Sequence, residues 1–258
     1  MIITLTTDFG ARDGYAGAIK GVIASRAPRA TVFDISHEIP SFDIAHAAFV
    51  LFTAAPFYPP GTVHVAVIDP GVGGARRGVV VVGRQHLFVG PDNGVFTPFL
   101  DEAAAVHELA DPDLWLGHAA ATFHGRDLFA PTAVHLAQGL APADCGPTVA
   151  EPVRLPAWNV EREGDALVAA VVHVDGFGNA ITGLSTERLA ELGEGSYAAT
   201  IAGHEPIAVR RTYADADSGQ LLALIGSTGL LELAVREGSA AAQLGLQRGD
   251  AVRFVRMD

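Results

Sequence analysis

The first half of the sequence alternates between short β-branched runs and helical segments, and this alternation restricts the folds open to the chain more than any other feature. Strands are expected at residues 2–6, 31–35 and 62–68, with helices between them at residues 14–26 and 44–55. Parallel strands need a long crossover connection, which a helix supplies. The pattern therefore predicts a mostly parallel sheet that is covered by helices on both faces.

The same half of the chain contains one expected hairpin. Residues 78–82 and 86–89 predict its two strands, and we expect the turn PDNG at residues 91–94 to close it. A further helix is expected at residues 125–138. The fold class predicted for residues 1–145 is therefore a Rossmann-like, three-layer α/β domain.

The composition changes after this domain. Residues 146–164 are rich in proline and lack hydrophobic periodicity, which predicts a linker. Beyond it, glycine-rich turns separate short strands that are expected at residues 166–174, 197–201, 207–210, 221–225, 230–235 and 251–255. This spacing predicts a smaller second domain over residues 165–258, built as an antiparallel β-barrel or sandwich.

Charge and composition restrict the partners of the chain. The formal net charge of −12 at pH 7 argues against nucleic acid or an anionic membrane as partner, because both attract basic surfaces. Apolar residues make up 49% of the sequence, so we expect copies of the chain to cover part of one another's surface. The apolar stretch at residues 44–58 is shorter than the ~20 residues that a membrane span needs. The single cysteine, Cys145, has no pairing partner, and a reducing cytoplasm is the expected compartment.

Polar residues occur where strands of the predicted parallel sheet end. Asp8 and Asp69 each follow a strand, and His124 stands just ahead of an expected helix. Ligands of open α/β sheets bind beyond the carboxyl ends of the strands, so these residues are candidates for a site. Each also has a structural interpretation. Asp8 is then a turn residue, His124 is satisfied by backbone, and Asp69 forms an ion pair with Arg76.

The segment VIDPGVGGARR joins Asp69 to Arg76 through a glycine-rich loop. A phosphate-binding loop is disfavoured, because the GxxxxGK[ST] pattern is missing and a strand follows where a helix should begin. The small residues allow a bend that brings Arg76 back toward Asp69. A metal site formed by His118, His124 and Asp127 is a weaker alternative, since no HExxH pattern is present.

Six motifs occur along the chain in the order TTDFG, HEIPSFD, VIDPGVGGARR, FHGRDLFAP, VDGFGNAITG and STGLLELAVREGSAA. Together they resemble the S-adenosyl-L-methionine (SAM) hydrolase family, or SAM hydroxide adenosyltransferases, which is related to the fluorinases and chlorinases. The resemblance implies a two-domain homotrimer that binds SAM between the N-terminal domain of one subunit and the C-terminal domain of its neighbour. It also implies that SAM and water are converted to adenosine and L-methionine, with no metal or organic cofactor.

The resemblance further implies roles for individual residues. The catalytic trio falls on Asp69, Arg76 and His124, and the sequence does not decide whether Asp69 or His124 takes the proton of the attacking water. The implied substrate-binding residues are Asp8 and Asp13 for ribose, Phe42 in the sugar pocket, Phe177, Asn179, Ser227 and Val235 for adenine, and Asp175, Tyr213 and Glu232 toward methionine.

Other functions stay open at this point. Halogenating relatives carry tyrosine at the position of Asp69 and serine at that of Gly125, so a chlorinase-like transfer of adenosyl to halide is disfavoured. A non-catalytic SAM or adenosine sensor would keep Asn179 and the ribose-binding aspartate without turnover. Two departures from the family pattern, Gly183 and Gly226, lie beside the implied adenine contacts.

Overall fold

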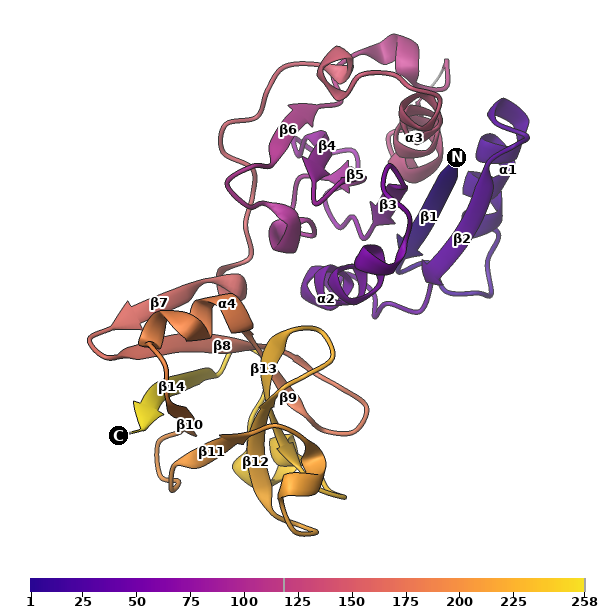
Figure 1. Ribbon diagram of the computed structural model, residues 1–258. Coiled ribbons are helices and arrows are strands. Elements are labelled where there is room, and N and C mark those ends of the chain that lie inside the picture. Colours follow the sequence, from indigo (N-terminus) through magenta and orange to yellow (C-terminus); the bar gives the residue numbers. More distant parts are fainter. Residues whose placement is uncertain (118, 258) are drawn as a thin grey trace. The chain divides into compact units, whose positions relative to one another are not determined.

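The computed structural model describes residues 1–117 and 119–257. Contacts between residues divide the chain into two compact units, Met1–Arg154 and Leu155–Asp258 (Figure 1). Each unit has its own sheet and its own hydrophobic core. No helix in the described ranges is long and apolar enough to cross a membrane.

The first unit is built on a six-stranded sheet in the order β2-β1-β3-β5-β4-β6. Its strands are β1 (Ile2–Thr7), β2 (Thr31–Ser36), β3 (Val63–Val67), β4 (Gly78–Gly83), β5 (His86–Pro91) and β6 (Ala105–Glu108). The pairs β1–β2, β1–β3 and β3–β5 are parallel, while β4 pairs antiparallel with both β5 and β6. The expected mostly parallel sheet is therefore confirmed.

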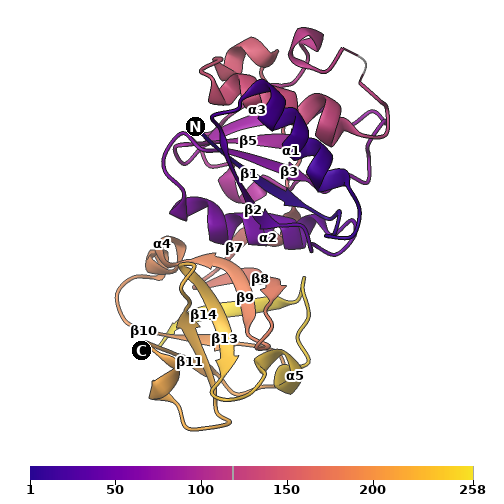
Figure 2. The same cartoon turned by 90° about the vertical axis from the view of Figure 1, so that its right-hand side faces the viewer.

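Helices cover both faces of this sheet (Figure 2). They are α1 (Tyr15–Arg26), α2 (Ile44–Ala54) and α3 (Ala130–Ala137). Successive side chains of a strand point to opposite faces. Ile3 and Leu5 of β1 consequently share one face, where they join Ile19 of α1 and Val134 of α3 in a single buried core. α2 packs over the other face, which completes the expected three layers.

Three local details differ from the sequence-based expectation. The hairpin of β4 and β5 turns at Arg84 and Gln85, whose φ values are 48° and 67°. The PDNG segment at residues 91–94 therefore follows the hairpin and does not close it. The helix expected at residues 125–138 is divided into a π-helical turn, η4 (Gly125–Phe129), and α3. β6 has no counterpart among the expected strands.

The second unit is a closed β-barrel. Its strands run in the order β14-β10-β11-β12-β13-β9-β8-β7, and a pairing between β14 and β8 closes the ring. They are β7 (Val160–Glu163), β8 (Ala166–Val174), β9 (Ala180–Ser185), β10 (Ser196–Thr200), β11 (Ile207–Arg210), β12 (Leu221–Ile225), β13 (Leu230–Val235) and β14 (Ala251–Met257). β11 and β12 are parallel, so the barrel is mixed where the sequence predicted an antiparallel one.

Two strands of the second unit were not among those expected, and one of them, β7, lies outside the closed ring. β7 lies within residues 146–164, the expected linker, where it pairs with β8. β9 follows the VDGFGN motif and pairs with β8 and β13. The remaining short helices and 3-10 turns are α4 (Thr186–Leu189), α5 (Ala240–Leu244), η1 (Ala55–Phe57), η2 (Thr97–Phe99), η3 (Pro112–Leu114), η5 (Pro142–Cys145), η6 (Pro156–Trp158), η7 (Ala190–Leu192) and η8 (Tyr213–Asp215).

Candidate active site

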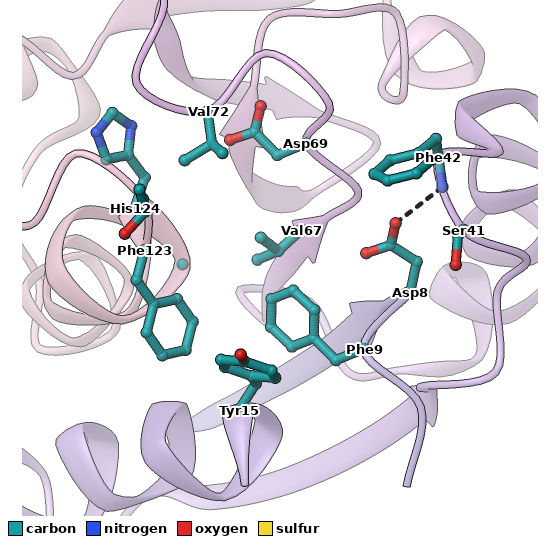
Figure 3. A pocket seen from close by; sticks show the side chains of 12 residues that line it. Asp8, Phe9, Tyr15, Ser41, Phe42, Val67, Asp69, Val72, Phe123 and His124 are labelled. Carbon is teal, nitrogen blue, oxygen red and sulfur yellow. Dashed lines mark hydrogen bonds between the residues drawn. The ribbon is translucent and has the colours of Figure 1, made fainter. Parts of the chain in front are cut away.

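A cavity of about 440 Å³ opens in the first unit beyond the carboxyl ends of β1 and β3 (Figure 3). Asp8 directly follows β1, Asp69 comes shortly after β3, and His124 precedes η4. β1 and β3 are parallel neighbours, so their carboxyl ends meet at one edge of the sheet. The cavity is lined by Asp8, Phe9, Tyr15, Ser41, Phe42, Val67, Asp69, Val72, Thr122, Phe123, His124 and Gly125.

The loop after β3 brings Arg76 back to Asp69. Val72 N donates to Asp69 O at 3.2 Å, which closes the first turn of the loop. Gly73 has a φ of +75°, and a Cβ atom there would lie 2.4 Å from Ala121 O, so only glycine fits. Arg76 Nε donates to Asp69 Oδ1 at 2.8 Å, and Arg76 Nη2 donates to Asp69 Oδ2. The two side chains are only 12% and 5% exposed, so the ion pair is largely shielded from water.

Arg76 also binds His124. Its Nη2 atom lies 2.7 Å from Nδ1 of the imidazole. Arginine has no acceptor and keeps its proton, so Nδ1 accepts this hydrogen bond and the neutral ring carries its proton on Nε2. Burial lowers the pKa of His124, and the charge of Arg76 lowers it further, which favours the same neutral form. Arg76 thus links the two candidate proton acceptors and fixes the tautomer of one of them.

Gly125 leaves the cavity wall beside His124 without a side chain. A Cβ atom at Gly125 would lie 3.1 Å from Val67 Cγ1 and 3.2 Å from Ile19 Cδ1. The residue begins η4, a π-helical turn of the kind that is frequent at functional sites. A serine at this position would therefore have to displace its apolar neighbours.

Asp8 and Phe42 lie together on the side of the cavity across from His124 (Figure 3). Phe42 N donates to Asp8 Oδ2 at 2.9 Å, which leaves Oδ1 of Asp8 open to a ligand. Phe42 has a φ of 67°, a left-handed backbone that non-glycine residues rarely adopt, and its side chain is 68% exposed. Asp13 is exposed and is not among the residues that line the cavity.

A second cavity, of about 560 Å³, lies in the second unit. It is lined by Phe177, Asn179, Tyr213, Val235, Arg236, Glu237 and Gly238. Phe177 is 82% exposed, an unusual state for a large aromatic side chain. Four of the residues that the sequence assigned to adenine or methionine binding therefore meet in one cavity, although they come from separate turns and strands.

Two carboxylates, Asp175 and the buried Glu232, support the walls of this second cavity. Asp175 Oδ1 accepts from the backbone N–H groups of Phe177 and Asn179, each at 2.9 Å, and Asn179 Nδ2 donates to Asp175 Oδ2 at 3.0 Å. Tyr213 donates its hydroxyl proton to Glu232, which is only 5% exposed. Burial raises the pKa of Glu232, and the nearby charge of Asp175 raises it further. Asp175 and Glu232 therefore hold the lining residues, and neither is itself part of the lining.

Ser227 is exposed in the turn between β12 and β13 and does not line the second cavity. Its neighbour Gly226 packs against Glu232, because a Cβ atom at Gly226 would lie 2.3 Å from Glu232 Oε2. The departure from the family pattern at Gly226 therefore has a local explanation, since the buried carboxylate fills the space of a side chain.

Comparison with known proteins identifies the family. The profile of the SAM hydroxide adenosyltransferase N-terminal domain matches residues 3–146, and that of the C-terminal domain matches residues 169–253. The chain belongs to the SAM hydroxide adenosyltransferase family. It is 44% identical to the (R)-S-adenosyl-L-methionine hydrolase of Salinispora arenicola over 97% of this chain and 96% of the relative. It is 43% identical to the (R)-S-adenosyl-L-methionine hydrolase of Thermus thermophilus over 96% of this chain and 97% of the relative.

More distant members and solved structures agree with this assignment. The fluorinase of Nocardia brasiliensis is 27% identical over 98% of this chain and 96% of its own length. A conserved protein of uncharacterized function from Thermotoga maritima has a TM-score of 0.85 at 33% identity, covering 99% of this chain and 100% of that structure. A conserved hypothetical protein from Thermus thermophilus has a TM-score of 0.77 at 39% identity, covering 98% and 99%.

The first cavity contains an aromatic cluster that was not predicted from the sequence. Phe9, Tyr15 and Phe123 lie with ring centroids 5.4–5.9 Å apart, two of the three contacts being T-shaped. All three line the cavity. Their position beside predicted site residues was a usable signal, because Phe9 follows Asp8 and Phe123 precedes His124.

The alternative of a metal site rests on His118, His124 and Asp127. His118 lies outside the described residues. Asp127 Oδ2 accepts from Arg126 Nη2 and from Ala120 N, each at 2.8 Å. Within residues 1–117 and 119–257, the structure has no group of three His, Cys, Asp or Glu side chains that could hold a metal ion.

Proposed function

We propose that this protein hydrolyses SAM to adenosine and L-methionine by in-line attack of water on the 5′ carbon of the ribose. The observation that carries the proposal is the array in which Arg76 holds Asp69 and His124 at the wall of one cavity. Near full-length identity of 42–44% to three proteins named (R)-S-adenosyl-L-methionine hydrolase supports the same reaction.

The sulfonium of SAM is a good leaving group, so catalysis has to act mainly on the nucleophile. A new bond forms between the water oxygen and C5′ while the C5′–S bond breaks and its electron pair stays on sulfur. The water proton must pass to a protein group as the attack proceeds. Arg76 remains protonated and supplies a fixed positive charge beside the developing hydroxide.

Asp69 is the proton acceptor in this proposal. Each of its oxygens accepts one hydrogen bond from Arg76 and retains a second lone pair. The Nδ1 atom of His124 already accepts from Arg76, and Nε2 carries the proton of the neutral ring. His124 therefore acts as a hydrogen-bond donor that orients the water, and it could take the proton only by breaking its contact with Arg76.

The substrate is recognised by both cavities in this proposal. Oδ1 of Asp8 accepts the ribose hydroxyls, while Phe177 offers an aromatic face and Asn179 an amide to adenine, and Tyr213 lies toward the methionine end. We assign Asp175 and Glu232 to the support of these residues. Ser227 and the backbone at Val235 stay proposed contacts of the adenosyl group, and Asp13 stays a proposed neighbour of the ribose.

We also propose a homotrimer in which the first cavity of one subunit and the second cavity of its neighbour act on one SAM molecule. The family resemblance supports this arrangement, and large exposed side chains such as Phe42 and Phe177 are consistent with surfaces that meet a partner. The reaction needs no metal ion or organic cofactor in this proposal. A cytoplasmic location is proposed from composition, because the single cysteine, Cys145, cannot form an internal disulfide.

Product analysis tests the reaction directly. Purified protein is incubated with SAM, with and without a chelator, and the products are separated by chromatography. We expect equal amounts of adenosine and L-methionine in both samples. Formation of 5′-chloro-5′-deoxyadenosine in chloride buffer would instead indicate adenosyl transfer to halide. Tight binding of SAM without any product, unaffected by Asp69→Asn, would indicate a sensor.

A further inference from the structure

His37 begins the loop between β2 and α2 and contacts the loop that follows β1. Both loops contribute residues to the lining of the first cavity. His37 directly follows β2, and its side chain is only 12% exposed. Its Nδ1 atom lies 2.8 Å from Thr7 Oγ1, and its backbone carbonyl accepts from Gly10 N at 2.7 Å. Thr7 and Gly10 flank Asp8, so His37 holds the loop that carries the ribose-binding carboxylate from both sides.

A second contact joins the loop after β1 to the loop between β2 and α2, and here Asp8 of the first loop is the acceptor. Asp8 Oδ2 accepts from the backbone N–H of Phe42, in the loop between β2 and α2. Phe42 keeps the strained φ of 67° only while neighbouring contacts hold it there. Asp43 N donates to Pro40 O at 2.9 Å, which closes the turn that presents the Phe42 amide. The two loops therefore form one cross-linked wall of the cavity.

The outer side of His37 is anchored as well. Its Nε2 atom lies 3.0 Å from Asp34 Oδ1, and Lys20 Nζ of α1 donates to Asp34 Oδ2 at 2.6 Å. Burial raises the pKa of Asp34, but the hydrogen bonds from Lys20 and His37 outweigh it and hold that pKa below its ordinary value. Asp34 is therefore an anionic group beside the outer edge of the His37 ring. The contact between Nδ1 of His37 and the Thr7 hydroxyl forms with either tautomer of the ring, because a hydroxyl both donates and accepts.

The register of the sheet explains why His37 reaches Thr7. β1 and β2 run parallel, and their pairing shifts by one residue between Leu5 and Thr6. Such an irregularity re-aims the side chains that follow it. The shift occurs just before both strands end, where His37 leaves β2 and Thr7 ends β1.

We infer that His37 is a positioning residue for substrate binding, which acts through Thr7 and the loop at Gly10 to hold Asp8 in the geometry that a ribose diol requires. This inference rests on the proposed function, because it takes Asp8 as the ribose contact. His37 itself does not line the cavity and is not a catalytic residue. Its effect falls on ground state and transition state alike, since the ribose contact is made in both.

The test compares His37→Ala, His37→Asn and Thr7→Val by adenosine binding in calorimetry and by SAM hydrolysis. His37→Ala is expected to weaken adenosine binding and to raise KM about tenfold, with kcat changed less than about threefold. Asparagine places an amide oxygen near the position of Nδ1, so His37→Asn is expected to recover most of the loss. Thr7→Val removes the same contact from the other side and is expected to match His37→Ala, with no further loss in the double variant.

The matched control is His107→Ala, which removes a partly buried histidine of β6. It is expected to leave the adenosine affinity and KM unchanged. A lower melting temperature in His37→Ala and Thr7→Val with unchanged adenosine affinity and KM would make His37 merely structural and would overturn the inference. Adenosine binding that follows the expected series without any SAM turnover would support the inference and overturn the proposed reaction instead. Wild-type protein that binds no adenosine would overturn both.

Discussion

The guanidinium of Arg76 and the imidazole of His124 are joined by a hydrogen bond in which the histidine can only accept, with Nη2 at 2.7 Å from Nδ1. The same guanidinium donates to both oxygens of Asp69. One cation therefore contacts two groups, a carboxylate and an imidazole, that are both proton acceptors by residue type. Its presence makes them inequivalent, because it occupies the basic nitrogen of His124 and leaves free lone pairs on Asp69.

Asp69→Asn should abolish most of the turnover. An amide keeps the shape of the carboxylate but cannot take a proton, so kcat is expected to fall by about 10²–10⁴-fold while KM changes little. Steady-state kinetics with SAM measures both. Asp92→Asn is the matched control, because Asp92 is a buried carboxylate held by Arg77 at 2.6 Å outside the cavity. A loss of kcat in the control equal to that in Asp69→Asn would refute a chemical role for Asp69.

His124→Asn should be much less damaging. The asparagine oxygen can accept from Arg76 in place of Nδ1, so we expect a loss of about tenfold in kcat from the poorer orientation of the water. The comparison with Asp69→Asn decides which residue takes the proton. If His124→Asn lowers kcat as much as Asp69→Asn does, the assignment of Asp69 as sole proton acceptor is wrong.

The fold was predictable to the extent that hydrophobic pattern decides it. The β-branched runs of β1 and β3 alternate with helical segments, and these elements occur where expected. β7 could not be found this way, because its sequence VERE is largely exposed and it is extended only through pairing with β8. The π-helical turn η4 has no local signal either, since its extra residue is accommodated by packing around Gly125.

The site was predictable where a polar residue follows a strand. Asp8, Asp69 and His124 meet at one cavity because parallel strands end at a common edge. The hydrogen bond from Arg76 to Nδ1 of His124 was not predictable, because the direction of a side chain depends on the packing of three separate segments. Aromatic residues such as Tyr15 resemble core residues in a sequence, so their place in the cavity lining needed the structure.

Acid should destabilise the first unit through His64. This residue is fully buried, its Nδ1 lies 2.7 Å from Thr4 Oγ1, and burial together with nearby His86 lowers its pKa to about 3. The unfolded chain takes up the proton near pH 6.5, whereas the folded chain does so only at much lower pH. The neutral His64 ring therefore makes its full contribution to the free energy of unfolding above about pH 6.5. That contribution falls by about 1.4 kcal/mol per pH unit as the pH decreases toward 3.

Urea unfolding of the wild type and of His64→Leu between pH 4 and pH 8 measures this slope. The variant is expected to be less stable at neutral pH, because it loses the contact with Thr4, but to show a flatter dependence between pH 4 and 6. His204→Gln, at an exposed histidine, serves as the control and should keep the wild-type slope. An unchanged slope in His64→Leu would contradict the depressed pKa.

Phe177→Ala should weaken substrate binding without affecting stability. The ring is 82% exposed in the second cavity, and stacking of a base on an aromatic side chain contributes about 1–3 kcal/mol. We expect KM to rise about tenfold or more, with a small change in kcat. Phe57→Ala is the matched control, because Phe57 is 85% exposed but lies outside both cavities. Equal effects of the two substitutions on KM would argue against adenine stacking at Phe177.

Subunit mixing should show whether the two cavities act across a subunit boundary. Asp69→Asn damages only the first cavity and Asn179→Ala only the second, so each variant alone is expected to be nearly inactive. In a cyclic trimer that contains both variants, one neighbouring pair combines an intact first cavity with an intact second cavity, which restores about one third of the sites. Mixed trimers purified through two different affinity tags measure this recovery. Asp69→Asn mixed with Arg76→Ala is the control and should recover nothing, because both changes damage the first cavity. A site formed within one subunit would give no recovery in either mixture.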